Sequence, residues 1–255
     1  MSDNYDESYY QNGAERGTQY NDYLEGSKLN RTYFEIAETI FELLRPRRAL
    51  EIGCATGVIV SHLRTFDVDA HGIDVSDWAV EHRVAPTVQQ GTADTLPFED
   101  GYFDLVYSVH ALEHLTAEIK DKAFDEVSRV CSGYQFHMMP MLESGPYVGD
   151  RFGHLLNLRT DPTHHLLYER NWWLTQFEAR GFRDTGVSIS FIHDNAHYEL
   201  SSCQLLVSRE EVAPELLRAA ATHNHKVAGA LSLALNGKPG PGLDVHIARL
   251  RAEHA

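Results

Sequence analysis

The residues best suited to chemistry form an acidic, glycine-rich turn between an apolar strand and an apolar helix start. Glu51 stands near the end of the apolar stretch, and the small residues Gly53, Ala55 and Gly57 follow it at even spacing. Small residues let a backbone approach a ligand closely, and the first turn of a helix offers free N–H groups. The turn therefore predicts a site for an adenosine-bearing cofactor.

The spacing of this turn separates two classes of cofactor. A dinucleotide loop has the pattern G-x-G-x-x-G, which brings a helix N-terminus to a pyrophosphate. Here each small residue is two positions from the next, and Glu51 precedes the first of them. An acid at this position suits a positively charged ammonium group. The turn therefore favours a cofactor without phosphate over a dinucleotide.

Two aspartates downstream could bind the nucleoside part of such a cofactor. Asp74 ends the apolar stretch 68–73, where an acid in a nucleotide-binding sheet accepts hydrogen bonds from ribose hydroxyls. Asp94 follows the next short strand, and a carboxylate there can accept from the amino group of adenine. The alternatives are that Asp74 only caps a helix and that Asp94 belongs to a plain loop.

Five segments in a fixed order make a specific resemblance. Over roughly residues 48–140, the chain resembles the class I S-adenosylmethionine (SAM)-dependent methyltransferases, of the small-molecule type common in natural-product and sugar pathways. It departs from the family at Ala55, which replaces the middle glycine of the loop. The matching segments are Glu51–Gly57, Gly72–Asp74, Ala93–Phe98, Phe103–Val109 and Ala111–Leu115.

The resemblance implies where SAM would lie. Independently of the resemblance, Tyr20 and Tyr23, in a polar and tyrosine-rich N-terminal stretch, are expected to fold over the cofactor and help to exclude water. The other implied cofactor residues are Glu51, Gly53, Cys54, Ala55 and Gly57 in the methionine-binding loop, Asp74 and Val75 at the ribose, Ala93 and Asp94 at adenine, and Ser108, Val109 and His110 beneath the sulfonium.

Methyl transfer itself needs little chemistry from the protein. SAM carries an activated methyl group, so the enzyme aligns an acceptor and excludes water. A base is needed only when the acceptor must lose a proton, and histidine suits that task. The candidate bases lie after the fourth strand, on the fifth strand and in a later insertion, and a core position is the alternative for the one on the fifth strand. They are His110, Glu113 and His114, then His137, then His154, His164 and His165. Packing or a solvated loop would explain the same residues without catalysis.

A metal is a second possibility at these positions. Glu113, His114, Asp161 and His164 are suitable ligand types, and a cation could acidify a diol or a phenol. Nothing in the spacing fixes such a site, because the adjacent Glu113 and His114 cannot both point inward from a regular helix. We therefore expect no metal.

Composition narrows the range of partners. The 255 residues carry 22 basic and 37 acidic side chains, a formal charge of −15, which argues against nucleic acid as a partner. Three cysteines lie far apart, as free thiols in a reducing compartment do. No apolar run is long enough to cross a membrane. We expect a cytoplasmic, soluble protein that acts on a small molecule and could form oligomers.

Alternating strand and helix patterns predict an α/β fold, with a doubly wound, mostly parallel, seven-stranded sheet. We expect an arm over 1–28, a cofactor domain over 29–210 with a lid at 141–170, and a helical tail over 211–255. Asp77 is expected to cap the third helix. The expected strands are 48–52, 68–73, 87–90, 104–109, 134–138, 185–192 and 199–207, the last two forming an antiparallel hairpin.

The sequence thus predicts SAM-dependent methylation of a small molecule, on oxygen first and on nitrogen next. Two alternatives remain open. One is a nicotinamide-dependent oxidoreductase on a similar sheet, which the loop spacing disfavours. The other is a SAM-binding module without catalysis.

Overall fold

The computed structural model describes residues 4–16, 18, 20–142, 161–192 and 203–236. Within these ranges the chain builds a seven-stranded sheet of order β3-β2-β1-β4-β5-β7-β6. Neighbouring strands from β3 to β5 are parallel, and β7 pairs antiparallel with both β5 and β6. The predicted fold class is confirmed. The strands are β1 (Arg48–Ile52), β2 (Asp69–Asp74), β3 (Val88–Gln90), β4 (Phe103–Val109), β5 (Cys131–Met138), β6 (Arg183–Asp184) and β7 (Gln204–Ser208).

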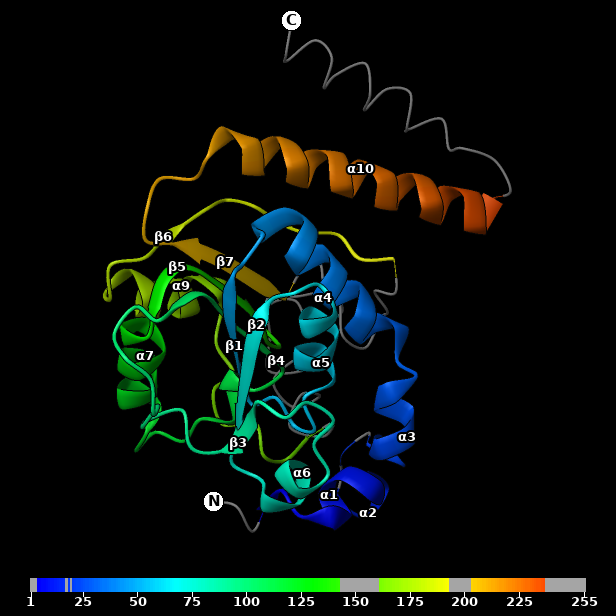
Figure 1. The fold of residues 1–255 in the computed structure, drawn as a ribbon, viewed down its shortest axis with the longest axis vertical. Helices are drawn as coiled ribbons and strands as arrows, with labels where there is room; N and C mark the ends of the chain where they lie inside the picture. Colours follow the sequence, from blue (N-terminus) through cyan, green and yellow to red (C-terminus); the bar gives the residue numbers. More distant parts are fainter. Residues whose placement is uncertain (1–3, 17, 19, 143–160, 193–202, 237–255) are drawn as a thin grey trace, which may run out of the picture.

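Helices cover both faces of this sheet (Figure 1). Helices α4 (Arg31–Leu44) and α5 (Val58–Thr65) pack together on one face, and α10 (Pro214–Asn236) lies beside α4. Helices α7 (Lys120–Arg129) and α9 (Arg170–Glu178) cover the other face. The central strands are therefore buried on both sides, which explains their nearly continuous apolar runs.

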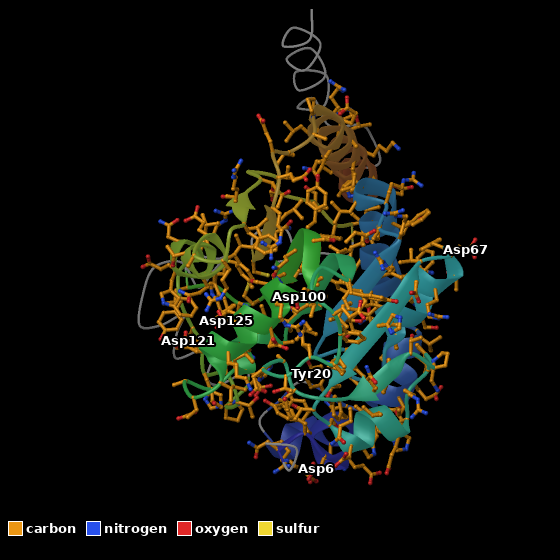
Figure 2. All side chains as sticks on the ribbon, turned by 60° about the vertical axis from the view of Figure 1, so that its left-hand side comes forward. Asp6, Tyr20, Asp67, Asp100, Asp121 and Asp125 are labelled. Atoms are coloured by element: carbon orange, nitrogen blue, oxygen red, sulfur yellow. The ribbon has the colours of Figure 1, made fainter. Side chains whose placement is uncertain are left out.

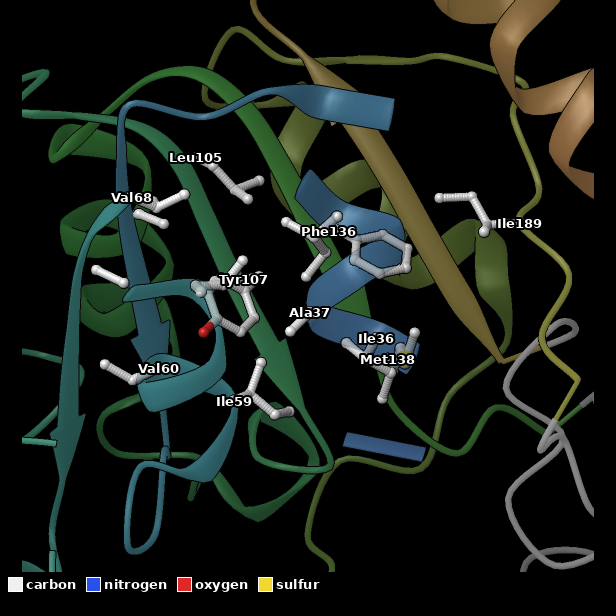
Figure 3. Packing of buried hydrophobic residues seen from close by; sticks show 14 of the residues in the cluster. Ile36, Ala37, Ile59, Val60, Val68, Leu105, Tyr107, Phe136, Met138 and Ile189 are labelled. Carbon is white, nitrogen blue, oxygen red and sulfur yellow. The ribbon is translucent and has the colours of Figure 1, made fainter. Parts of the chain in front are cut away.

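Figure 3 shows the core between the sheet and helices α4 and α5. Leu105 and Tyr107 of β4 and Phe136 of β5 pack there against Ile36 of α4 and Ile59 of α5, and all five side chains are almost fully buried. Side chains of this size each contribute a few kcal/mol by leaving water. This packing fixes the strands whose carboxyl ends carry the candidate site.

Short helices occupy the carboxyl edge of the sheet. The first helices are α1 (Glu7–Gln11), α2 (Gly13–Arg16) and α3 (Tyr23–Lys28), and Figure 1 shows α1 and α2 close to α6 (Asp77–Glu81). The prediction that Asp77 caps α6 is wrong. The hydroxyl of Ser76 accepts the N–H of Ala79 at 3.0 Å and is the cap.

The predicted strand at 185–192 is also wrong. Its residues alternate between buried and more exposed, with Val187, Ile189 and Phe191 buried, but beyond Thr185 its backbone binds side chains instead of the backbone of a neighbouring strand. The Ile189 N–H donates to Oε1 of Gln204 at 2.9 Å, and the Ser190 N–H donates to Oδ1 of Asn224 at 2.7 Å. Hydrogen bonding to the sheet stops shortly after β6, so an extended segment lies beside the sheet without joining it.

Parts of the predicted lid and tail lie outside the described residues, namely 143–160 and 237–255. In the part of the chain that is described, no helix combines the length and apolarity that a bilayer span requires. The three cysteines are buried thiols, as their spacing predicts.

Candidate active site

The turn after β1 has a left-handed backbone at its three small residues. The φ angles are +68° at Gly53, +47° at Ala55 and +78° at Gly57. A Cβ at Gly53 would lie 2.4 Å from the Ala111 Cβ, and one at Gly57 would lie 2.4 Å from Cγ2 of Val88. Both glycines are therefore required by conformation and by space. Ala55 adopts the same conformation with a side chain, at a cost of about 1–2 kcal/mol.

Asp74 holds this turn in place from the end of β2. Its Oδ2 accepts the N–H of Ala55 at 2.6 Å, and its Oδ1 accepts the N–H of Ser76 at 2.8 Å. Burial raises the pKa of the Asp74 carboxyl, although these backbone donors favour the ionised form. One carboxylate thus ties together the glycine turn and the start of α6.

A cavity opens beside this carboxylate at the carboxyl edge of the sheet, where ligands bind in folds of this kind. The glycine turn, the ends of β2 and β4 and the N-terminal arm surround it. The predicted cofactor residues that line it are Gly53, Ala55, Asp74, Val75, Ala93, Val109 and Tyr20, and the predicted bases that line it are His110, His114 and His165.

Other predicted residues lie away from the cavity lining. Glu51 is buried beneath the turn and accepts a hydrogen bond from the Tyr107 hydroxyl at 3.2 Å; burial raises its pKa well above the usual range. Ser108 is fully buried and pairs with Nδ1 of His137 at 2.8 Å. Cys54 and Gly57 lie in the turn but do not line the cavity either. Binding of SAM by any of these residues stays a prediction.

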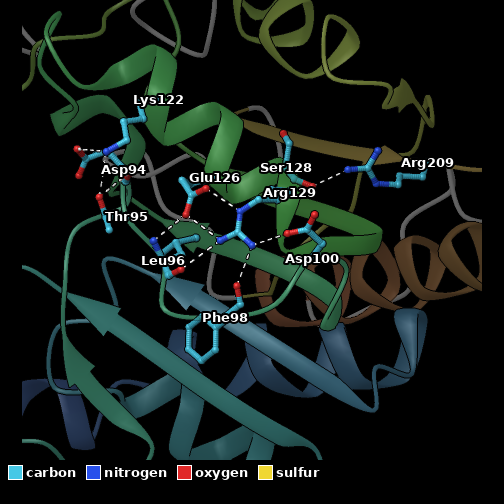
Figure 4. A network of polar contacts seen from close by, with 10 residues as sticks. All are labelled: Asp94, Thr95, Leu96, Phe98, Asp100, Lys122, Glu126, Ser128, Arg129 and Arg209. Atoms are coloured by element: carbon cyan, nitrogen blue, oxygen red, sulfur yellow. Dashed lines mark hydrogen bonds and ion pairs between the residues drawn. The ribbon is translucent and has the colours of Figure 1, made fainter.

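Asp94 points toward α7 rather than into the cavity. Its Oδ2 lies 3.8 Å from Nζ of Lys122. Figure 4 shows the network behind it, in which Glu126 accepts the N–H of Leu96 and Arg129 donates to the carbonyl oxygens of Leu96 and Phe98. This network fixes the loop after β3 and so positions Ala93, which lines the cavity.

The N-terminal arm closes the cavity with tyrosines, of which sequence reasoning assigned only Tyr20 and Tyr23. Tyr10 is 5% exposed and stacks on Trp78 of α6, with ring centroids 5.1 Å apart and an interplanar angle of 15°. Tyr20 packs against Tyr9 and Tyr23, and Figure 2 shows it above Asp6 of the arm. The density of tyrosines in an otherwise polar N-terminus was the available signal. The additional lining tyrosines are Tyr5, Tyr9 and Tyr10 of the arm and Tyr33 of α4.

A chain of hydrogen bonds links the arm to His114. The Tyr9 hydroxyl donates to Oδ2 of Asp161 at 2.8 Å, and the Thr163 hydroxyl lies 2.6 Å from Oδ1 of Asp161 and 2.8 Å from Nδ1 of His114. Burial raises the pKa of the neighbouring Tyr5 to about 12, so its hydroxyl stays protonated at neutral pH. The arm, the segment after residue 160 and the end of β4 therefore meet at one histidine.

Glu113 and His164 lie next to this histidine. The turn that carries Glu113 and His114 is a 3-10 helix, η2 (Leu112–His114), rather than a regular helix. Glu113 is fully buried, and Nε2 of His164 lies 4.0 Å from its Oε1. Burial alone would raise the pKa of the Glu113 carboxyl, but the hydrogen bonding and charge of the surrounding histidines, His110 first, lower it. Burial lowers the pKa of His164 to about 4.

His137 is a core residue. It is fully buried in β5, with Nδ1 paired to Ser108 at 2.8 Å and Nε2 to Gln135 at 2.9 Å. Burial lowers its pKa to about 3, so it is neutral at physiological pH. It does not line the cavity, which leaves the histidines after β4 and in the later segment as the candidates for chemistry.

Comparison with known proteins identifies the class of this domain. Residues 50–133 match the sequence profile of a family described as "Methyltransferase domain". Residues 50–133 therefore match a methyltransferase domain, in agreement with the class I, SAM-dependent type that the sequence resembles.

Relatives of known name agree with this class. Ajmaline N-methyltransferase from Rauvolfia serpentina is 32% identical over 99 residues, which are 34% of this chain and 33% of that protein. The chain spans between 33% and 56% of the lengths of the curated relatives it matches.

Two solved structures share the fold. A SAM-dependent methyltransferase from Thermotoga maritima, described as a possible histamine N-methyltransferase, gives a TM-score of 0.57 at 18% identity, over 74% of this chain and 95% of that one. Magnesium protoporphyrin IX methyltransferase from Synechocystis PCC 6803, with S-adenosylhomocysteine bound, gives 0.56 at 13% identity, over 80% and 97%.

Proposed function

We propose that this chain catalyses the transfer of a methyl group from SAM to a small-molecule acceptor, on oxygen. The observation that carries this proposal is a cavity that joins the glycine turn, Asp74 and a set of histidines under a tyrosine cover. This cover consists of Tyr5, Tyr9, Tyr10, Tyr20 and Tyr23. The products are the methylated acceptor and S-adenosylhomocysteine.

In this proposal the chain's own residues bind and orient the cofactor. Asp74 accepts from the ribose hydroxyls while it keeps its bonds to the turn, since a carboxylate has about four acceptor positions. Gly53 lets the methionine end approach the backbone, and Ala93 borders the adenine. The tyrosine cover excludes water, because aromatic rings fill the mouth of the cavity without competing charges.

Oxygen is favoured as the accepting atom because bases line the acceptor side. A hydroxyl must lose its proton on methylation, and His110, His114 and His165 are within the lining. Nitrogen is the second candidate, since ajmaline N-methyltransferase and the Thermotoga maritima protein carry N-methyltransferase names. The polar lining and the formal charge of −15 support a small acceptor rather than a nucleic acid.

Turnover separates this function from its alternatives. Purified full-length chain is incubated with SAM carrying a labelled methyl group and two acceptor panels, one of phenols and sugars and one of amines. Label transfer to the first panel is expected. Transfer to amines alone would move the accepting atom to nitrogen. Tight SAM binding with no transfer to either panel would support a binding module, and binding of NADH instead of SAM would support an oxidoreductase.

The organisation of the chain follows from the same proposal. We assign residues 1–28 to an arm that covers the cofactor, 29–210 to the catalytic domain with a lid over 141–170, and 211–255 to a tail. Cytoplasmic location, a role in secondary metabolism and an oligomeric state belong to this proposal as well. Gel filtration with light scattering tests the last of these.

A further inference from the structure

Three side chains beside the cavity have the composition of a metal site. Glu113, His114 and His164 each offer one ligand atom, and these atoms lie within 4.8 Å of one another. Glu113 and His114 are adjacent in the 3-10 helix η2, and His164 comes from a separate segment and lies close to both. Its ring centroid is 4.8 Å from that of His114, and its Nε2 is 4.0 Å from Oε1 of Glu113. A ligand from another segment thus removes the objection drawn from adjacency.

The carboxylate of Glu113 is fully buried, and its charge is balanced only by histidines. Its side chain is 0% exposed, and in the described ranges the groups that favour its ionised form are the imidazoles of His110, His114 and His164. The nearest polar groups are imidazole nitrogens, with Nδ1 of His110 at 3.4 Å and Nε2 of His164 at 4.0 Å. An isolated buried carboxylate is strongly destabilising, whereas a bound cation satisfies it.

Thr163 prepares His114 as a ligand. Nδ1 of His114 lies 3.3 Å from the Thr163 carbonyl oxygen, which can only accept, and 2.8 Å from the Thr163 hydroxyl, which donates to Asp161. Nδ1 therefore carries the proton, and the lone pair is on Nε2. Histidine ligands of metals are commonly fixed by a hydrogen bond of this kind to the other ring nitrogen.

We propose that Glu113, His114 and His164 bind one divalent transition-metal cation, Zn²⁺ or Mn²⁺, at the edge of the cavity. Two imidazoles and one carboxylate are donors that suit these ions and leave coordination positions open. Ligand atoms around a tetrahedral Zn²⁺ lie about 3.4 Å apart, so closure needs side-chain shifts of about 1 Å.

The position of the site beside the cavity would allow the cation to take part in methyl transfer. His114 lines the cavity. His110, shortly before Glu113 in the sequence, and His165, directly after His164, line it as well. A cation there would bind the acceptor's oxygen and make its proton easier to lose. Only this role rests on the proposed function, because binding of the cation itself needs no methyl transfer.

Metal binding is tested on the full-length chain after treatment with a chelator and removal of any tag. Zn²⁺ and Mn²⁺ are titrated separately by calorimetry, and Co²⁺ is added to detect visible absorption bands of a bound ion. One ion per chain is expected. Glu113→Gln and His164→Asn should each weaken binding at least about 100-fold, and Thr163→Val, a positioning change, about 10- to 100-fold.

The matched control is His62→Asn in α5, a partly exposed histidine that does not line the cavity and should leave binding unchanged. If Glu113→Gln fails to fold, His164→Asn decides. Binding to several weak sites, or binding that survives His164→Asn, overturns the proposal. S-adenosylhomocysteine is titrated into the same samples: its binding without any metal binding would overturn the metal site alone, and metal binding without it would overturn only the proposed function.

Discussion

The tyrosine cover makes a strong prediction about cofactor binding at Tyr10. This side chain is 5% exposed and stacks on Trp78, and its ring also lies 5.1 Å from that of Tyr9 and 5.2 Å from that of Tyr23. All of these contacts join the arm to itself or to α6, and none joins it to the sheet core. Tyr10→Ala should therefore release the arm while the α/β core stays folded.

The size of the effect follows from the ring that is removed. Truncation of a buried aromatic residue to Ala costs about 3–5 kcal/mol, of which a stacked pair accounts for about 0.5–1.5 kcal/mol. This loss opposes docking of the arm. Because apparent affinity falls with the fraction of competent protein, a loss of about 3 kcal/mol weakens binding of S-adenosylhomocysteine by about 100-fold. Tyr20→Ala should weaken binding less, because Tyr20 is only partly buried.

Calorimetry with S-adenosylhomocysteine and limited proteolysis of the arm measure the two parts of this prediction. The chain offers a matched control in Tyr168, which is 38% exposed and stacks on Trp172 at 3.9 Å without lining the cavity. Tyr168→Ala should leave affinity unchanged. An arm that is cut rapidly in Tyr10→Ala while affinity stays at the parent value would refute the role of the cover.

Three further changes test the site and the core. Asp74→Asn should weaken binding of S-adenosylhomocysteine about 10- to 100-fold by calorimetry, since a hydrogen bond to a charged group contributes about 1.5–3 kcal/mol. The control Asp67→Asn, in an exposed turn before β2 (Figure 2), should leave this affinity unchanged. Ala55→Gly should raise the free energy of unfolding by about 1 kcal/mol in urea by relieving a left-handed alanine, whereas Ala123→Gly inside α7 should lower it by a similar amount. His137 is neutral when folded, with a pKa of about 3; it ionises in the unfolded chain near its usual pKa of about 6.5, so its contribution is complete above that pH and is lost as pH falls toward 3. His137→Asn should therefore reduce the acid slope of stability by up to about 1.4 kcal/mol per pH unit.

The sheet could be predicted from sequence because its strands carry a strong local signal. β1 and β4 are short, mostly apolar runs between turns and helices, and burial on both faces of the sheet favours that composition. The segment 185–192 carries an equally good alternation. Its backbone donates hydrogen bonds to the side chains of Gln204 and Asn224. Such bonds to residues far along the chain cannot be inferred from the local pattern of apolar and polar residues.

The site could be predicted in part for a similar reason. The glycine turn and Asp74 could be recognised by residue type. Only small residues fit the left-handed turn, and an acid ends the strand that follows it. The direction of a side chain is decided by tertiary contacts. Lys122 attracts Asp94 toward α7, and burial beneath the turn takes Glu51 out of the lining.

The meeting of Glu113 with His164 was also hidden from sequence. Fifty residues of chain separate the two positions, and the backbone bonds that join them run from His165 and Leu166 to the carbonyl oxygen of Glu113, at 2.8 and 2.9 Å. Backbone hydrogen bonds of this kind do not depend on residue type, so they cannot be recognised in the sequence. The donor types were visible in the sequence, but their convergence was not.

The central claim is that the cavity at the glycine turn holds a SAM-type nucleoside. Calorimetric titration of the full-length chain with S-adenosylhomocysteine tests it most directly, with NADH titrated in parallel. One site per chain for S-adenosylhomocysteine and no heat with NADH are predicted. Heat with NADH alone, or none with either ligand, would contradict the account.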